Sequence, residues 1–228
     1  MTVTNNAQTA RGPWLVLAGV TSFIATLALA SWTAPPPTTR AVYLDAVKTA
    51  TDANGWVQQF LGVVAGAGIL VLAALVLVFT RRAMLTGAAS LARALVAGVG
   101  VVSAYATSEV LKLLLTQPRP CATLVVNALV ECPASGDWSL PSNHATIAGA
   151  LACAVALIAP RWTALAMLTS ILVAVARVTT GVHYPHDVLT GLTLGASTVA
   201  VAAIVLDRPA RALVRFATSR WPVIAQHP

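Results

Sequence analysis

The chain has 228 residues, of which 57% are hydrophobic and 9% are charged, and its formal net charge is +7. A soluble domain carries about 25% charged residues, so this composition indicates a membrane protein and excludes an ordinary soluble domain. The basic residues lie mainly between or just beyond apolar stretches, so membrane topology accounts for them better than nucleic-acid binding does. We expect one membrane domain over residues 1–228, with a short N-terminal tail and a basic cytoplasmic tail at 207–228.

Six apolar stretches approach the roughly 20 residues that a membrane-spanning helix needs. They are Trp14–Trp32, Trp56–Thr80, Ser90–Leu115, Ser142–Pro160, Trp162–Thr179 and His186–Leu206. The first stretch is long for a signal peptide, so we interpret it as an uncleaved span. The sequence therefore predicts an all-α polytopic membrane protein with six transmembrane helices.

The arginines between and beyond these stretches fall on one side of the predicted spans. They are Arg11, Arg81, Arg82, Arg161, Arg208, Arg211, Arg215 and Arg220. The opposite loops hold Arg40 and Lys48 against Asp45 and Asp52, which leaves no positive excess there. The positive-inside rule then predicts that both termini are cytoplasmic, in the plasma (inner) membrane of a bacterium.

Two further segments have helical patterning outside the predicted spans. Thr38–Ala53 interleaves polar and apolar residues and is expected to lie on the outer membrane surface. In Arg208–Trp221, arginines recur three and four residues apart beside apolar residues. This tail is either a basic interfacial helix on anionic lipid or a frayed end.

Polar and ionisable residues gather at one end of predicted spans three to six. They are Lys112, Arg119, Ser142, Asn143, His144, Arg177, His183 and Asp187. Spans three and five end outside and spans four and six begin there, so all of them are expected at the extracytoplasmic face. Charge at membrane depth is costly, which makes each of these residues a functional candidate.

The residue types at this face suit a phosphoryl group. Guanidinium groups match phosphate oxygens with paired hydrogen bonds, and the free N–H groups where a helix begins also favour an anion. A neutral imidazole can attack phosphorus, and a protonated one can donate a proton to the leaving oxygen. A carboxylate four residues after His183 can orient that imidazole, as Asp187 is placed to do.

Three motifs in this region resemble those of the type 2 phosphatidic acid phosphatase superfamily, which includes the vanadium haloperoxidases. K-x-x-x-x-x-x-R-P matches Lys112–Pro120, and P-S-G-H appears as Pro141–His144. S-R-x-x-x-x-x-H-x-x-x-D matches Ala176–Asp187. Asn143 replaces the glycine of the second motif and Ala176 replaces the serine of the third, while every charged and histidine position is kept.

The resemblance implies a role for each motif residue. His183 would be the nucleophile oriented by Asp187, and His144 the general acid. The phosphate would be bound by Lys112, Arg119, Ser142, Asn143 and Arg177. The implied reaction is hydrolysis of a lipid phosphate or diphosphate through a phosphohistidine, with no metal and no cofactor. Polyprenyl diphosphate, phosphatidylglycerol phosphate and phosphatidic acid all fit as substrates.

Two other functions remain open at this point. A lipid phosphotransferase would use the same phosphohistidine with an alcohol as acceptor. A membrane transporter would spread its charges through the bilayer depth, whereas these charges gather at one face. The sequence does not indicate an oligomeric state.

Several residues near the motifs have expected local roles. Cys121 and Cys132 share one polar loop and are either disulfide-bonded or free thiols. Glu109 lies one turn before Lys112 and is expected to pair with it. His186 is expected to be peripheral. Asp137 could shape the headgroup pocket, but it is interpreted as part of the loop structure.

Overall fold

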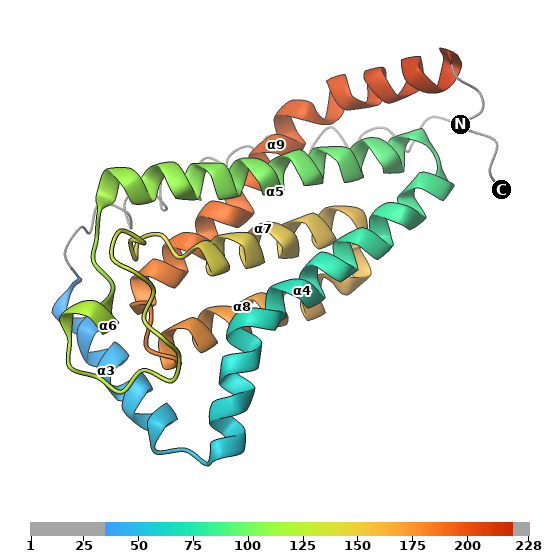
Figure 1. The fold of residues 1–228 in the computed structure, drawn as a ribbon. Helices are drawn as coiled ribbons and strands as arrows, with labels where there is room; N and C mark the ends of the chain where they lie inside the picture. The colour runs from blue at the N-terminus through green and yellow to red at the C-terminus, as the bar shows by residue number, and fades with distance from the viewer. Residues whose placement is uncertain (1–34, 221–228) are drawn as a thin grey trace.

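The computed structural model describes residues 35–220, so the predicted span Trp14–Trp32 lies outside the described residues. Every regular element in the described part of the chain is a helix (Figure 1). The elements in chain order are α3 (Pro37–Thr51), α4 (Gly55–Thr86), α5 (Ala88–Leu115), α6 (Pro120–Thr123), α7 (Asn143–Ile158), the 3-10 turn η1 (Pro160–Trp162), α8 (Thr163–Thr179) and α9 (Pro185–Arg220).

Within residues 35–220, four helices are long and apolar enough to cross a membrane: α4, α5, α8 with its preceding turn, and α9. The all-helical class and the several apolar spans are therefore confirmed for this part of the chain. Helix α7 has 16 residues, or about 24 Å at the α-helical rise, which is shorter than a hydrocarbon core of about 30 Å. The count of six spans stays a prediction.

Large apolar side chains cover the outside of the helix bundle. Examples with more than half of their surface exposed are Val63, Leu77, Val102, Leu113 and Val205. An exposed apolar surface of this extent is unusual on a soluble protein but is what helices need where they face lipid tails. The structure is therefore that of a multi-pass membrane protein.

Two predicted boundaries were wrong. Helix α4 continues past Arg81 and Arg82 to Thr86, because arginine is a good helix former and does not itself end a helix. Helix α9 runs unbroken to Arg220 with Pro209 inside it, so the sixth predicted span continues into the basic tail. Of the two alternatives for the tail, the helix is therefore confirmed up to Arg220 and the frayed end is wrong there. Helix α3 agrees with the predicted surface helix to within two residues at each end.

Helix α7 lies at the centre of the bundle, packed against α4, α5, α8 and α9. Its many alanines allow neighbours to approach on all sides, and most of its residues are buried. Helix α9 comes closest. A Cβ atom added to Gly195 would lie 2.0 Å from the Thr146 carbonyl oxygen, and one added to Gly191 would lie 2.6 Å from the Ser142 carbonyl oxygen. Glycine is therefore required at both positions for α7 and α9 to pack at this distance.

Because successive long helices run in opposite directions, their ends form two groups at opposite ends of the bundle. The C-terminal ends of α5 and α8 meet the N-terminal ends of α7 and α9 at the left of Figure 1, beside α3, α6 and the long loop at 124–142. The α4–α5 turn, η1 and the C-terminal half of α9 lie toward the other end. The arginines of those three segments are therefore separated from the polar cluster by the length of the bundle.

Replacing Gly195 by alanine is expected to destabilise the protein, because the new methyl group forces α7 and α9 apart. Overpacking of this kind costs about 1–3 kcal/mol. Gly98→Ala is the matched control: it changes a glycine in a helix interior where an added Cβ meets nothing within 4 Å. The control should leave stability unchanged or raise it by roughly 0.5–1 kcal/mol. Thermal unfolding in detergent measures both, and equal midpoints for the two variants would contradict the packing argument.

Candidate active site

His183 and Asp187 form a buried pair where α9 begins. The Nδ1 atom of His183 lies 3.5 Å from Oδ2 of Asp187, and both side chains are almost completely buried. The same Oδ2 accepts hydrogen bonds from the Ser139 hydroxyl at 2.5 Å and the Tyr184 backbone N–H at 2.8 Å. Asp187 therefore holds the turn before its own helix, which brings its carboxylate to the imidazole.

Ser139 is part of this pair although the sequence analysis missed it. Its hydroxyl oxygen is 3.3 Å from Nδ1 of His183 and donates its single proton to Asp187. It can therefore only accept from the imidazole, which favours the tautomer with the proton on Nδ1 and a lone pair on Nε2. A neutral loop serine has no periodicity or charge that marks it, and its place two residues before the second motif was the only available signal.

The other imidazole nitrogen faces Arg119. The Nη1 atom of Arg119 lies 2.8 Å from Nε2 of His183 and donates to the Val182 carbonyl oxygen at 3.1 Å. Both Arg119 and Lys112 are buried with only 5% of their surface exposed. Burial, and then the charges of Arg119, Arg177 and Lys112, lower the pKa of His183 well below its usual value of 6.5. The imidazole is therefore neutral at neutral pH.

Arg177 and Ser142 each keep a buried donor that no described residue satisfies. The Nε atom of Arg177 and the hydroxyl of Ser142 are both buried, and neither has a hydrogen-bond partner among the described residues. The Ser142 backbone N–H donates to the Asp187 carbonyl oxygen at 3.1 Å, which joins the start of α7 to α9. His144 follows two residues later on α7, near enough to influence the pKa of His183. Buried unpaired donors beside cations are what an anion site needs.

Asp137 has a different place from the one expected. Its carboxylate oxygen Oδ1 lies 2.7 Å from Nζ of Lys112 and 3.0 Å from Nη2 of Arg119. Burial alone would raise the pKa of Asp137, but the hydrogen bonds and charges of the two cations outweigh it and lower the pKa below its usual value. The loop role predicted for Asp137 was therefore incomplete, because this carboxylate also binds the cations of the first motif.

Asn143 points its side chain toward α5. Its amide nitrogen donates to the Glu109 carboxylate, and its amide oxygen accepts from the Ser108 hydroxyl at 2.7 Å. The predicted Glu109–Lys112 pair was wrong, because Lys112 forms its ion pair with Asp137 and Glu109 accepts a hydrogen bond from Asn143. A contribution of Asn143 to phosphate binding would have to come from its backbone.

His186 was wrongly expected to be peripheral. It is buried, and its Nε2 atom lies 3.1 Å from the second Asp187 oxygen, Oδ1. Gln117 also reaches Oδ1 at 3.3 Å through its amide nitrogen. Both oxygens of the Asp187 carboxylate therefore have donors next to them, so the carboxylate has little freedom to rotate.

Cys121 and Cys132 are joined by a disulfide, with the two Cα atoms 5.9 Å apart. The remaining cysteine, Cys153, is free. The closed loop donates the Leu129 N–H to the Thr180 carbonyl oxygen at 3.1 Å, just before the turn that carries His183. On the other side, the Tyr43 hydroxyl of α3 donates to the Gly181 carbonyl oxygen at 2.9 Å. The loop and α3 thus support the His183 turn from two directions.

The model of the PAP2 superfamily matches residues 93–210, which is just over half of the chain and contains all eight predicted catalytic and phosphate-binding residues. The chain belongs to the PAP2 superfamily. Its fold agrees with this assignment. The crystal structure of the first transmembrane PAP2 type phosphatidylglycerolphosphate phosphatase from Bacillus subtilis superposes with a TM-score of 0.58 at 20% identity, over 89% of this chain and 96% of that one.

Curated relatives with sequence similarity include three phosphatases. The undecaprenyl-diphosphatase of Sulfolobus acidocaldarius is 37% identical over 98 residues, 42% of this chain and 47% of that protein. The lipid A 1-phosphatase of Rhizobium johnstonii is 39% identical over 85 residues, 37% of this chain and 34% of that protein. The decaprenylphosphoryl-5-phosphoribose phosphatase of Mycobacterium tuberculosis is 37% identical over 110 residues, 47% of this chain and 58% of that protein. The matches thus span between a third and three fifths of these relatives.

Proposed function

We propose that this protein hydrolyses a lipid phosphate or diphosphate through a phosphohistidine formed on His183. The observation that carries the proposal is the orientation of this imidazole. Its Nδ1 atom faces Ser139 and Asp187, while its Nε2 atom faces Arg119. A neutral imidazole whose lone pair is directed toward buried cations suits attack on an anionic phosphorus centre.

The reaction has two steps in this proposal. Nε2 of His183 attacks phosphorus, and the P–O bond to the lipid breaks while His144 donates a proton to the leaving oxygen. Water then attacks the phosphohistidine, His144 takes a proton from that water, the P–N bond breaks, and inorganic phosphate leaves. Lys112, Arg119 and Arg177 balance the phosphoryl charge, the Ser142 hydroxyl donates to a phosphoryl oxygen, and Asp187 stabilises the positive charge that develops on His183.

We place the reaction at the outer face of the plasma membrane. The arginines of α4, η1 and α9 lie toward the end of the bundle away from the site, and by the positive-inside rule that end is cytoplasmic. A disulfide between Cys121 and Cys132 beside the site suits an oxidising compartment. The proposal includes six spans in a single membrane domain over residues 1–228, with both termini cytoplasmic.

The substrate class follows from the relatives and remains broad. Three of them are named for activity on an undecaprenyl diphosphate, a lipid A 1-phosphate and a decaprenylphosphoryl phosphoribose. These compounds share a terminal phosphate on a lipid-anchored molecule. We propose the same chemical class for this chain, with polyprenyl diphosphate, phosphatidylglycerol phosphate and phosphatidic acid as the substrates to test.

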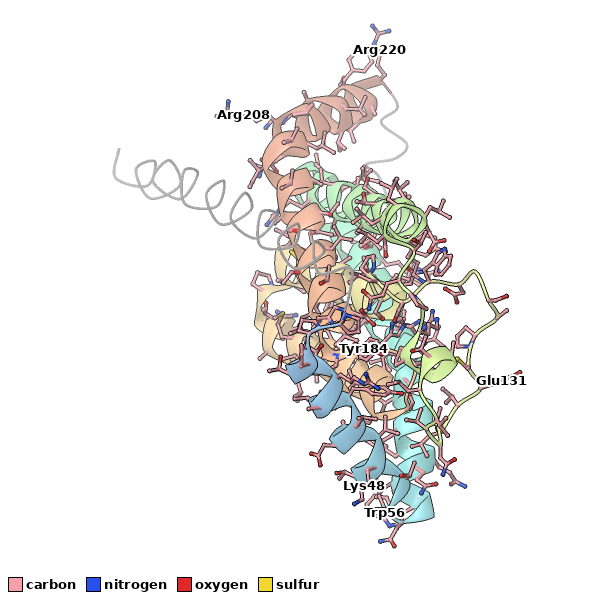
Figure 2. All side chains as sticks on the ribbon, turned by 90° about the vertical axis from the view of Figure 1, so that its left-hand side faces the viewer. Lys48, Trp56, Glu131, Tyr184, Arg208 and Arg220 are labelled. Carbon is pink, nitrogen blue, oxygen red and sulfur yellow. A yellow bond between two sulfur atoms is a disulfide. The ribbon has the colours of Figure 1, made fainter. Side chains whose placement is uncertain are left out.

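Purified protein in detergent and excess chelator is expected to release inorganic phosphate from at least one of these three lipids. His183→Ala should lower the rate by about 10⁴-fold or more, as loss of a nucleophile does. His144→Ala should lower it by about 10²- to 10⁴-fold through loss of the general acid. Glu131→Gln is the matched control, because Glu131 lies at the outer edge of the loop and outside this network (Figure 2). Normal turnover by His183→Ala protein would rule out the mechanism.

Ser139→Ala is expected to lower kcat by about 10- to 100-fold, the scale of a lost hydrogen bond to a charged group, with little change in KM. The physical reason is that the imidazole loses the acceptor that holds its Nδ1 proton, while the phosphate-binding cations are untouched. Steady-state kinetics of Ser139→Ala beside Ser139→Thr, which keeps the hydroxyl, measure this. A change confined to KM, or an equal loss in both variants, would contradict the positioning role.

The pH dependence follows from the lowered pKa of His183. The nucleophile must be neutral, so its protonation removes activity only as pH falls below the usual histidine value of about 6.5. We therefore expect protonation of His183 to cause no loss of kcat/KM down to that pH, after correction for the second ionisation of the substrate phosphate near pH 6. An acid limb centred above about pH 7 and absent from the substrate's own titration would contradict a neutral, buried nucleophile.

A further inference from the structure

The Asp137 carboxylate lies on the cations that the proposed function assigns to phosphate. Its Oδ1 atom is 2.7 Å from Lys112 Nζ and 3.0 Å from Arg119 Nη2. The Asp137 backbone oxygen also accepts from Arg119 Nε at 2.8 Å. In the described part of the chain, no other carboxylate lies within salt-bridge distance of either cation. Two cations with their side chains almost fully buried thus share a single negative charge.

A further buried donor near this position is left over. Arg177 Nε has no partner among residues 35–220, and Arg177 is close enough to Asp137 and Arg119 for their charges to act on it. Arg119 also reaches past Asp137 to Nε2 of His183. A carboxylate has two oxygens and one charge, whereas a terminal phosphoryl group has three oxygens and up to two charges. A phosphoryl group therefore satisfies more of these donors than Asp137 does.

Asp137 is also able to leave. Its side chain is 47% exposed, whereas that of Asp187 is fully buried. It belongs to a loop turn in which its N–H bonds the Ala134 carbonyl oxygen and the preceding Gly136 has a φ of 95°. A carboxylate that moves from this place enters solvent, so its release does not bury an unpaired charge. Asp187, held by Ser139 and the Tyr184 N–H, has no such route.

We propose that Asp137 is an affinity-setting residue that competes with ligand phosphate for Lys112 and Arg119. This proposal rests on the proposed function of the site and concerns how tightly anions bind there. To displace Asp137, a ligand has to interact more favourably with the two cations than the Asp137 carboxylate does. A terminal phosphate or diphosphate brings the charge to do so, while a phosphodiester brings one charge and two ester oxygens.

The membrane itself gives this competition a consequence. Ordinary phospholipid headgroups are phosphodiesters, and their local concentration beside a membrane protein is very high. An open site with three cations would be occupied by them, because even weak binding saturates at high concentration. A carboxylate tethered to the same cations raises the apparent dissociation constant of every anion by a common factor, so it lowers the diester occupancy of the resting site without changing the ratio of anion affinities.

The test is a calorimetric titration of wild-type and Asp137→Asn protein in detergent with two soluble probes, inorganic phosphate and the monoanionic diester dimethyl phosphate. Asp137→Asn is expected to bind each probe about fivefold more tightly, the scale of one half-exposed ion pair. Glu131→Gln, which removes an exposed carboxylate of the same loop, should bind both as the wild type does. Asp137→Ser is the second variant in case the amide disturbs folding, and it should behave as Asp137→Asn does.

Two outcomes overturn the proposal. Equal or weaker binding of both probes by both Asp137 variants would mean that the carboxylate holds Lys112 and Arg119 in place rather than competing for them. A gain that persists when Lys112→Gln and Arg119→Gln are both added to Asp137→Asn would mean that the probes bind elsewhere. Titration needs no turnover, so tighter binding without phosphate release from any lipid would refute the proposed function and leave the competition intact.

Discussion

The close packing of α7 against α9 is the constraint on which the site depends. Glycines at 191 and 195 bring the α9 backbone against the carbonyl oxygens of Ser142 and Thr146. At that distance the Ser142 N–H reaches the Asp187 carbonyl oxygen at 3.1 Å, so the second and third motifs share one hydrogen-bonded junction. A larger residue at either glycine would separate the helix that carries His144 from the turn that carries His183. Small residues in the two helices therefore determine where the reactive groups stand.

Two carboxylates in this site have opposite physical situations. Asp187 is fully buried and accepts from Ser139 and Tyr184 on one oxygen, while His186 and Gln117 lie against the other. A buried charge with this many donors is fixed in place, as an orienting group has to be. Asp137 is half exposed, and among residues 35–220 it is bound only by the cations and its own loop, so its position depends on what else binds there. Asp187 is thus a fixed part of the structure, whereas Asp137 can be displaced from the cations by another anion.

Sequence reasoning picked out residues that the structure brings together but missed much of what surrounds them. Lys112, Arg119, Arg177, His183 and Asp187 stood out because charge at membrane depth is rare and because topology brings their helix ends together. Ser139 and Gln117 did not stand out, since a neutral side chain in a loop looks the same whether it faces solvent or a buried carboxylate. The predicted partner of Lys112 was wrong because helical spacing brings Glu109 near it, while the loop at 124–142 delivers a carboxylate that spacing rules do not see.

The sequence by itself determined the helical class, the alternating direction of the apolar helices and the residue types at each helix end. These are local properties, because hydrophobic length and periodicity act within one segment and the direction of each helix follows from the one before it. Tertiary structure alone decided which carboxylate meets which cation, that Cys121 bonds to Cys132, and which imidazole nitrogen faces Arg119. Those outcomes depend on how closely α7 and α9 pack and on the path of a loop without periodicity. The packing distance and the loop path both arise from contacts between segments, so the sequence of a single segment does not predict them.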